Sequence, residues 1–367
     1  MKRIADHSLL DQAKQNKNDE FYTLLPDIER ELAHYSAHFQ GKSVLCNCDD
    51  PTTSNFFRYF VQNFRRLGLK KVVASCIGKP GGDLFSPFEP GFYYEYTGEQ
   101  KATPRIDDVK YFQGDGDFRS AESIALLDAA DIVVTNPPFS LFHEFVAMLI
   151  LYDKSFIIWG NNSAITYKNF FPLIKENKVW LGYLVNQTCV FRLSDDYDKW
   201  NEKITKEKND GKKYGKVPAI SVYTNLDIKK RHDKLITWKK FADGEYPKYE
   251  NYDGIDIGSY DSKGNWQGDL SIIPCDYYGI MGVPITFLDK YNPDQFEIVG
   301  CPDYKGLYGA DYLGVTRMGE EWLAAYRKQG GTGHYTANML SLVFYDSNGN
   351  TCKAYKRIMI RRKDGSK

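Results

Sequence analysis

The segment Asp131-Ile132-Val133-Val134-Thr135-Asn136-Pro137-Pro138-Phe139 decides the fold. An acidic residue followed by four β-prone residues predicts a short buried strand. Two successive prolines then remove two backbone donors and fix a rigid extended turn directly after the strand. We expect this turn to direct carbonyl oxygens and the Asn136 side chain into a crevice, with the Phe139 ring alongside.

The groups in this turn suit a planar amine. Such an amine can donate its two hydrogens to the Asn136 amide oxygen and the Pro137 carbonyl, while Phe139 stacks on the ring that bears it. The amine lone pair is then turned toward an electrophile. The alternative interpretation is a turn that only ends the strand, with Phe139 as a core residue.

Outward from this segment, the chain up to about residue 160 alternates strands and helices. This alternation predicts an α/β fold with a Rossmann-like, doubly wound and largely parallel sheet. Ligands bind outside the carboxyl ends of strands in such sheets, so Asp49-Asp50-Pro51 and residues 136–139 should face one crevice. The expected strands are 43–48, 71–77, 131–135 and 156–159, and the expected helices cover about 26–35, 56–64, 124–130 and 145–149.

Beyond residue 160 the pattern changes. Turn pairs such as Asp210-Gly211, Asp243-Gly244 and Asp253-Gly254 separate short apolar runs. Dense turns of this kind are typical of antiparallel hairpins and long loops. We therefore place a domain boundary near residue 185, with an α/β domain over 1–185 and a loop- and hairpin-rich region over 186–367.

The composition bounds the class of protein. A chain of 367 residues exceeds what one hydrophobic core usually serves, and 42% hydrophobic with 26% charged residues is ordinary for a soluble globular protein. The formal net charge of zero excludes a uniformly basic surface, although a local basic face is still possible. The seven cysteines are expected to be reduced thiols. With no apolar stretch near the membrane-spanning length of about 20 residues, these features favour a soluble cytoplasmic protein.

Several motifs together resemble a known family. Residues 136–139 resemble the Asn-Pro-Pro-Phe/Tyr motif of amino-methyltransferases, in which those groups hold the target amine. The order of the motifs and the residues in them resemble the EcoRI-type family of adenine-specific DNA methyltransferases, over roughly residues 16–345. The further segments that share this resemblance are 18–23, 44–51, 114–118, 161–162 and 279–288.

The resemblance implies S-adenosylmethionine as the cofactor and a Rossmann-like catalytic domain followed by a target-recognition region. The implied cofactor contacts are Asn18, Phe21, Tyr22 and Thr23 at the methionine part, Asp49, Asp50 and Pro51 in the turn after the first strand, and Asp115, Asp117 and Phe118 near the adenine. Turn formation is the alternative role of Asp115 and Asp117, and helix capping is that of Asn18. The turn after the first strand lacks the usual glycines, and the second strand ends in Ser75-Cys76 without a ribose-binding acid.

Basic side chains in the second half could contact DNA. Lys356-Arg357 and Arg361-Arg362-Lys363 flank Ile358-Met359-Ile360, a strip that could lie on phosphates, although charge runs are more often solvated faces. None of the six histidines has metal-ligand spacing, so we expect no metal. The DNA-binding candidates are Arg192, Lys239, Lys240, Arg361 and Arg362.

The expected reaction is transfer of a methyl group to N6 of adenine in a short duplex DNA sequence. The base is rotated out of the helix, and its amine attacks directly in line, since the cofactor already bears an activated methyl group. The expected partners are double-stranded DNA and a functionally paired restriction endonuclease, with a monomer acting on DNA in the cytoplasmic nucleoid. The alternatives are cytosine N4, RNA adenine or protein glutamine as the substrate, or a non-catalytic nucleic-acid-binding protein with this fold.

Overall fold

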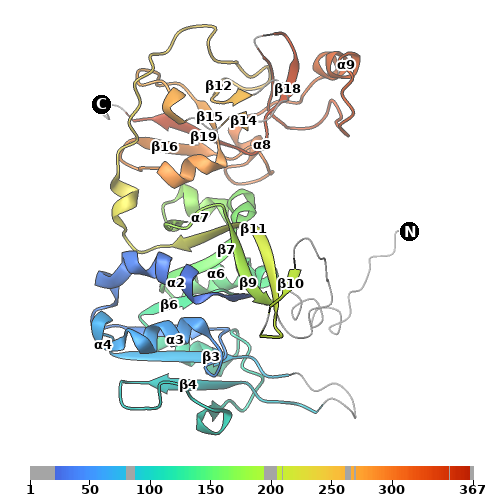
Figure 1. Ribbon diagram of the computed structural model, residues 1–367. Coiled ribbons are helices and arrows are strands. Elements are labelled where there is room, and N and C mark those ends of the chain that lie inside the picture. The colour runs from blue at the N-terminus through green and yellow to red at the C-terminus, as the bar shows by residue number, and fades with distance from the viewer. Residues whose placement is uncertain are drawn as a thin grey trace. The chain divides into compact units, whose positions relative to one another are not determined.

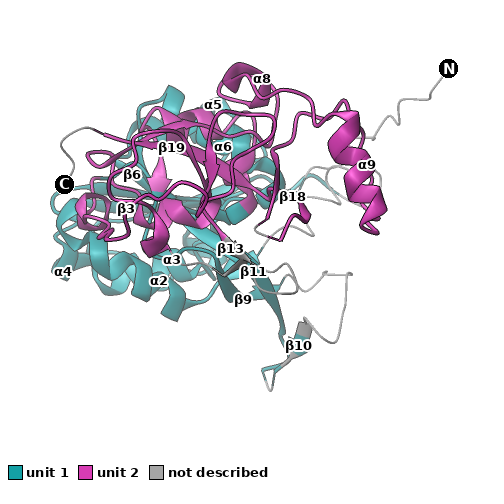
Figure 2. Cartoon of the chain, turned by 90° about the horizontal axis from the view of Figure 1, so that it is seen from above, with its two compact units in different colours: residues 1–162, 181–226 teal, residues 163–180, 227–367 magenta. Residues whose placement is uncertain are grey.

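A computed structural model describes residues 21–79, 87–193, 205–208, 210–260, 266–267, 270–346 and 348–363. The chain divides into two compact units (Figure 2): unit 1 comprises 1–162 and 181–226, and unit 2 comprises 163–180 and 227–367. Residues 186–226, which we expected in the target-recognition region, lie in unit 1 because their strands complete its sheet. The functional division near residue 185 stays a prediction.

Unit 1 is built around an eleven-stranded sheet (Figure 1). Nine strands follow one another in the order β1-β9-β11-β7-β6-β2-β3-β4-β5, and β8 and β10 each pair with β11. The strands are β1 Phe21–Thr23, β2 Ser43–Asn47, β3 Lys71–Cys76, β4 Phe92–Tyr96, β5 Lys110–Tyr111, β6 Ile132–Thr135, β7 Ser155–Asn161, β8 Trp180–Leu181, β9 Gln187–Leu193, β10 Thr205–Glu207 and β11 Lys213–Thr224.

The sheet is mixed, and the expectation of a largely parallel sheet is correct only for its centre. Strands β7, β6, β2 and β3 are parallel, whereas β4, β5, β11, β9 and β1 pair antiparallel with their neighbours. The direction of each strand follows from the length of the connection that leads into it. Parallel neighbours need a long crossover, which helices supply between β2 and β3 and between β6 and β7. Among the described residues between β3 and β4 there is no helix, and β4 returns beside β3 in the opposite direction.

The helices of unit 1 begin where the sequence supplies a start signal. Pro26 lies in the first turn of α2, and the Ser54 hydroxyl caps α3 by accepting from the Phe56 and Phe57 amides. Phe56 then packs edge-on against Trp159 of β7, with ring centroids 4.9 Å apart. The helical elements of unit 1 are α2 Leu25–Leu32, η1 Ala33–Phe39, α3 Asn55–Gln62, α4 Phe64–Leu67, η2 Ile106–Asp108, α5 Ala121–Asp128, η3 Phe139–Leu141 and α6 Phe142–Leu151. The short helix η4 Asn162–Thr166 begins at the last residue of the first segment of unit 1 and continues in unit 2.

Unit 2 contains a four-stranded sheet and two small hairpins. The sheet order is β12-β15-β19-β16, formed by Ile255–Asp256, Met281–Pro284, Arg357–Arg362 and Phe296–Gly300. The hairpins pair β13 Ser259–Tyr260 with β14 Trp266–Gln267 and β17 Val343–Tyr345 with β18 Thr351–Lys353. The helical elements are α7 Phe171–Lys175, η5 Lys229–His232, η6 Leu270–Ile272, η7 Ile285–Lys290, α8 Ala310–Leu313 and α9 Glu320–Lys328. The expected antiparallel hairpins beyond residue 160 are thus confirmed.

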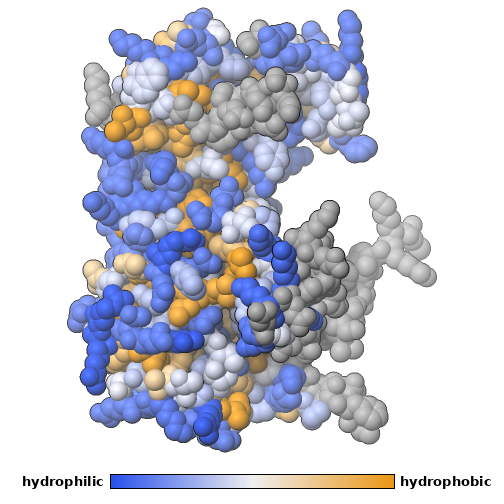
Figure 3. Space-filling model, viewed as in Figure 1, coloured by the Kyte–Doolittle hydropathy of each residue, from blue (hydrophilic) through white to orange (hydrophobic). Residues whose placement is uncertain are grey.

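The visible face in Figure 3 is mostly hydrophilic, and apolar side chains form small separate patches on it. Scattered apolar side chains are normal on a protein surface. Within the described part of the chain, no helix has both the length and the apolar character needed to cross a membrane.

Candidate active site

The turn after β6 leaves one buried acceptor without a partner. The Asn136 side-chain amide donates from Nδ2 to the Phe21 carbonyl at 2.6 Å. Its oxygen Oδ1 is buried and accepts no hydrogen bond. Because a carbonyl can only accept, the contact with Phe21 fixes the amide orientation and commits Oδ1 to receiving a donor. An unsatisfied buried acceptor costs about 1–3 kcal/mol, which a ligand amine could recover.

This turn borders a cavity of about 510 Å³ in unit 1. The cavity lies at the carboxyl ends of β2, β3 and β6, as expected for an α/β sheet. Asp49, Asp50, Asn136 and Pro138 all line it, so the two turns share one crevice as predicted, although Pro51, Pro137 and Phe139 do not line it. The other lining residues are Phe21, Tyr22, Thr23, Asn47, Cys48, Phe56, Cys76, Ile77, Gly78, Lys79, Glu89, Pro90, Phe92, Ile106, Tyr111, Gly116, Asp117, Phe118 and Leu141.

Asp49 is a half-buried residue just after the end of β2. It accepts hydrogen bonds of 2.8 Å from the hydroxyls of Ser54 and Thr135. Burial raises the pKa of Asp49 to about 7, although these two hydrogen bonds act in the opposite direction. The Thr135 hydroxyl also contacts the Asn47 carbonyl. Asp49 is therefore connected to the residue directly before Asn136.

Asp50 and Pro51 mainly shape the turn after β2. The Asp50 carboxylate accepts from the Thr52 amide at 2.8 Å and from the Thr52 hydroxyl at 2.7 Å. The Asp50 carbonyl accepts from the Ser54 amide at 2.7 Å, which leads into α3. Pro51 is buried and does not line the cavity. The turn thus achieves its shape with Asx-type hydrogen bonds in place of the usual glycines.

The loop 114–118 is held against the ends of β3 and β4 by backbone contacts. The Gly78 amide donates to the Asp115 carbonyl at 2.7 Å, and the Gly91 amide donates to the Gly114 carbonyl at 3.1 Å. A Cβ at Gly91 would lie 2.4 Å from the Asp115 carbonyl oxygen, so only glycine permits this approach. Asp115 itself does not line the cavity, and its carboxylate accepts from the Asp117 amide at 3.0 Å.

Asp117 and Phe118 present an ionised acid and an aromatic ring to the cavity. Two Arg119 guanidinium nitrogens donate to the Asp117 carboxylate at 2.9 and 2.8 Å, and a third reaches Glu144 at 2.9 Å. Burial raises the pKa of Asp117, but the hydrogen bonds and charge of Arg119 outweigh it and hold that pKa below its usual value. Phe118 is buried and packs edge-on against Phe145 at 5.3 Å.

Strand β1 places Phe21, Tyr22 and Thr23 on the cavity, and Asn18 lies outside the described residues. Phe21 contacts Phe139, with ring centroids 5.3 Å apart, and both rings contact Phe191 of β9. Phe139 is half-buried in this cluster and does not line the cavity. Its ring therefore packs on β1 and β9.

Sequence reasoning missed a charged pair at the end of β3. Lys79 and Glu89 pair at 2.9 Å, and both line the cavity where an acid after the second strand was sought. The signal was available, since an acid and a base bracket the Gly- and Pro-rich loop. Asp83, a further acid in this loop that could bind the ribose, lies outside the described residues.

The five DNA-binding candidates occupy different environments. The Arg192 guanidinium lies 4.5 Å from the centre of the Tyr22 ring, beside the cavity of unit 1. Lys239 pairs with Glu245 at 3.2 Å, while Lys240 and Arg361 are exposed. These positions assign no DNA contact, so the role of these residues stays a prediction.

The expectation of one continuous basic strip along β19 is wrong. Arg362 is buried and donates to the Thr237 hydroxyl at 2.7 Å and to the Pro274 carbonyl at 3.1 Å. Arg357 is also buried and pairs with Asp256 at 2.8 and 3.0 Å. Both arginines are buried because β19 is an inner strand between β15 and β16. Only part of its positive charge reaches solvent.

An amide acceptor held at a strand end, beside a cavity with acidic walls, is the arrangement expected of an amino-group methyltransferase. The chain belongs to the family of adenine-specific methyltransferases typified by EcoRI, whose model matches residues 9–363. It is accordingly an adenine-specific DNA methyltransferase, with S-adenosylmethionine as the methyl donor.

The chain is similar to three type II methyltransferases. It is 47% identical to M.EcoRI of Escherichia coli over 82% of this chain and 90% of that protein. It is 40% identical to M.MpnI of Mycoplasma pneumoniae over 79% of this chain and 84% of that protein. It is 39% identical to M.MgeORF184P of Mycoplasma genitalium over 79% of this chain and 85% of that protein. No solved structure matches the chain.

Proposed function

We propose that this protein methylates N6 of adenine within a short fixed sequence of duplex DNA, after rotating the base out of the helix. The observation that supports this most directly is the buried Asn136 Oδ1, which is oriented by Phe21 and has no donor. An adenine amine has two hydrogens to donate. Inside duplex DNA this amine is paired, so the base must leave the stack, at a cost of a few kcal/mol.

The residues of the turn hold the amine. Asn136 Oδ1 and the Pro137 carbonyl accept its two hydrogens, and this pairing points the nitrogen lone pair away from the turn. Pro138 keeps the backbone extended, and Phe139 offers a ring face on which the base stacks, a contact of about 1–3 kcal/mol. Positioning of this kind can contribute several kcal/mol to lowering the barrier.

The cavity residues fit S-adenosylmethionine. When bound, the cofactor supplies an activated methyl group that an amine attacks directly. Tyr22, Thr23 and Asp49 line the cavity, and Asp117 and Phe118 offer a carboxylate and a ring to a purine. A volume of about 510 Å³ is within the usual range of small-molecule sites. Asp50, Pro51 and Asp115 shape the surrounding turns.

We further propose that the sheet of unit 1 is a Rossmann-like methyltransferase sheet, with the catalytic function over 1–185 and target recognition over 186–367. The four parallel strands with their crossover helices support the first part. The protein acts as a monomer in the cytoplasm, on nucleoid DNA, and is functionally paired with a restriction endonuclease. Duplex DNA is the partner, because the major groove displays a distinct pattern for every base pair.

The test is product analysis. Plasmid DNA treated with the protein and cofactor is digested to nucleosides, analysed by mass spectrometry and sequenced as single molecules. We expect N6-methyladenine confined to one short sequence. N4-methylcytosine as the main product would reject the adenine assignment, and label found only in RNA or protein would reject the DNA assignment.

A further inference from the structure

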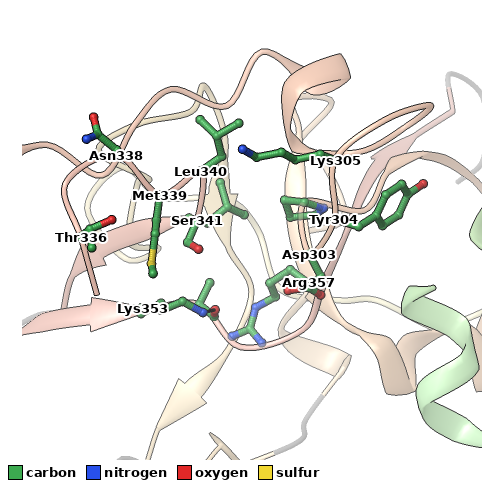
Figure 4. Close-up of a pocket in the computed structure, with 13 residues that line it drawn as sticks. Asp303, Tyr304, Lys305, Thr336, Asn338, Met339, Leu340, Ser341, Lys353 and Arg357 are labelled. Carbon is green, nitrogen blue, oxygen red and sulfur yellow. Dashed lines mark hydrogen bonds between the residues drawn. The ribbon is translucent and has the colours of Figure 1, made fainter. Parts of the chain in front are cut away.

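A second cavity lies within unit 2, between the turn after β16, the segment before β17 and the end of β18 (Figure 4). Its volume is about 340 Å³. None of the five basic residues selected from the sequence lines it. The lining residues are Pro302, Asp303, Tyr304, Lys305, Thr336, Asn338, Met339, Leu340, Ser341, Leu342, Lys353, Ala354 and Arg357.

Two lysines give this cavity a positive charge that the protein does not neutralise. Across the described ranges, neither the Lys305 nor the Lys353 ammonium has a carboxylate within ion-pair distance. The Lys353 ammonium lies 3.5 Å from the Ala354 carbonyl, and Lys305 is exposed. Lys239, in contrast, already has a carboxylate partner. The two cavity lysines are therefore available to an external anion.

The other two charged residues of the cavity, Arg357 and Asp303, do not remove this positive charge. Arg357 adds no free charge, because its guanidinium is held by the buried carboxylate of Asp256. Asp303 is the only acid in the lining, and burial raises its pKa while the nearby Lys353 lowers it. One acid against two unpaired lysines leaves the cavity net positive.

Neutral hydrogen-bonding groups surround the lysines. Lys305 extends from one side of the space, and Thr336 and Asn338 lie on the opposite side (Figure 4). The Asn338 oxygen accepts from Arg317 at 3.1 Å, which leaves the Asn338 nitrogen as a donor. Hydroxyl and amide donors beside lysine ammonium groups are the side chains that most often contact phosphate oxygens in protein–DNA complexes.

We propose that this cavity binds the phosphodiester backbone of duplex DNA, with Lys305 and Lys353 as the contacting cations. This inference rests on the proposed action on duplex DNA and adds the residues that hold the strand. Each phosphate that a lysine neutralises releases condensed counterions, so each contact steepens the salt dependence of binding. Phosphate contacts of this type position the protein and do not read sequence.

The experiment measures the affinity of the full chain for a fluorescent duplex over a range of salt concentrations. The variants are Lys305→Gln, Lys353→Gln and the double variant. The matched control is Lys328→Gln, which removes an exposed lysine of α9 outside the cavity. We expect the slope of log affinity against log salt to fall by about 0.9 for each lost contact. The control should keep the wild-type slope, and all variants should keep their affinity for S-adenosylmethionine and their melting temperature.

The outcomes separate this site from the function itself. If the wild type binds the duplex and the double variant has an unaltered slope, the cavity does not contact DNA. A thermal shift by inorganic phosphate that the double variant loses, with no change in the DNA slope, would assign the cavity to a small anion and overturn the proposal. A wild type that binds no duplex would reject the proposed action on duplex DNA, and this site with it.

Discussion

Asn136 has one committed donor and one free acceptor, and this asymmetry predicts the effect of replacing it. Asn136→Ala removes the acceptor for the amine but no group that holds the cofactor. We expect methyl transfer to fall by a factor of about 10²–10³, which is typical for removal of one transition-state hydrogen bond. Cofactor affinity measured by calorimetry should change little. A parallel loss of both would place Asn136 in the cofactor site.

Substitution of Phe139 tests whether its ring stacks on the target base or only packs against neighbouring side chains. The residue contacts Phe21 and Phe191, so Phe139→Ala also loses internal contacts. Phe139→Tyr and Phe139→Trp keep an aromatic face and should retain most of the affinity for DNA with an unpaired target base. Phe139→Ala should weaken it by about 1–3 kcal/mol. Equal binding by all three variants would make Phe139 a core residue only.

The raised pKa of Asp49 predicts that the stability of the folded protein depends on pH. The single hydrogen of the Thr135 hydroxyl faces two acceptors, the Asn47 carbonyl and Asp49, and a protonated Asp49 satisfies both contacts. Burial raises the Asp49 pKa to about 7, so the folded protein keeps this proton at pH values where the unfolded chain has lost it. Relative to Asp49→Asn, wild-type stability should therefore fall as pH rises from about 4 to about 7, and stay constant above.

Thermal unfolding of wild type and Asp49→Asn at successive pH values measures this difference. Asn keeps the size of the side chain and cannot ionise, so it is the matched control. A difference in stability that does not change across the interval would show that the Asp49 pKa is ordinary.

At the scale of elements, the loop 114–118 depends on one close backbone approach. Gly91→Ala would place a Cβ 2.4 Å from the Asp115 carbonyl oxygen and force the loop away from β4. We expect a loss of about 1–3 kcal/mol in stability and a clear loss of cofactor affinity. Gly114→Ala in the same loop is the control, because its nearest neighbour would be the Glu122 side chain at 3.5 Å. Equal effects of the two substitutions in unfolding and calorimetry would contradict the model of this loop.

Elements with strong local signals were predictable, and their neighbours in the sheet were not. The apolar run 132–135 and the helix around Phe56 and Phe60 were both found from the sequence. The antiparallel direction of β4 and β11 was not, because periodicity specifies a strand but says nothing of its partner. Direction depends on whether a crossover helix intervenes, and on where long-range pairing places the strand.

At the scale of the whole molecule, the two compact units should respond separately to damage. Asp256→Ala removes the partner of the buried Arg357 and leaves a buried charge uncompensated in unit 2, a change that typically costs about 3–5 kcal/mol. Hydrogen exchange followed by mass spectrometry should show faster exchange in β12, β15 and β19. Peptides of β2, β3 and β6 should keep wild-type protection. Uniform loss of protection over both units would show that they unfold together.

The neighbouring residues of one short segment were enough to predict the chemistry of this protein. The strand and turn over 131–139 can be predicted from neighbouring residues, because prolines restrict their own backbone and Asn136 stands directly before them. Asp49 follows because it stands just after a strand of an alternating α/β chain, whereas Asp117 and Phe118 are implied by the resemblance to a family. Such local signals depend only on residues close together in the chain, so a single sequence is enough to detect them.

Which polar groups are free could be seen only from the three-dimensional fold. Arg357 and Arg362 look like a phosphate-binding strip in the sequence, yet both are buried and bonded to distant residues. Lys305 and Lys353 gave no signal, and they stand unpaired beside one cavity. The physical reason is that burial and pairing depend on contacts between residues far apart in the chain, such as Asp256 and Arg357 at a separation of 101 positions and Thr237 and Arg362 at 125. A charge can be counted in a sequence, but its availability depends on what the fold brings next to it.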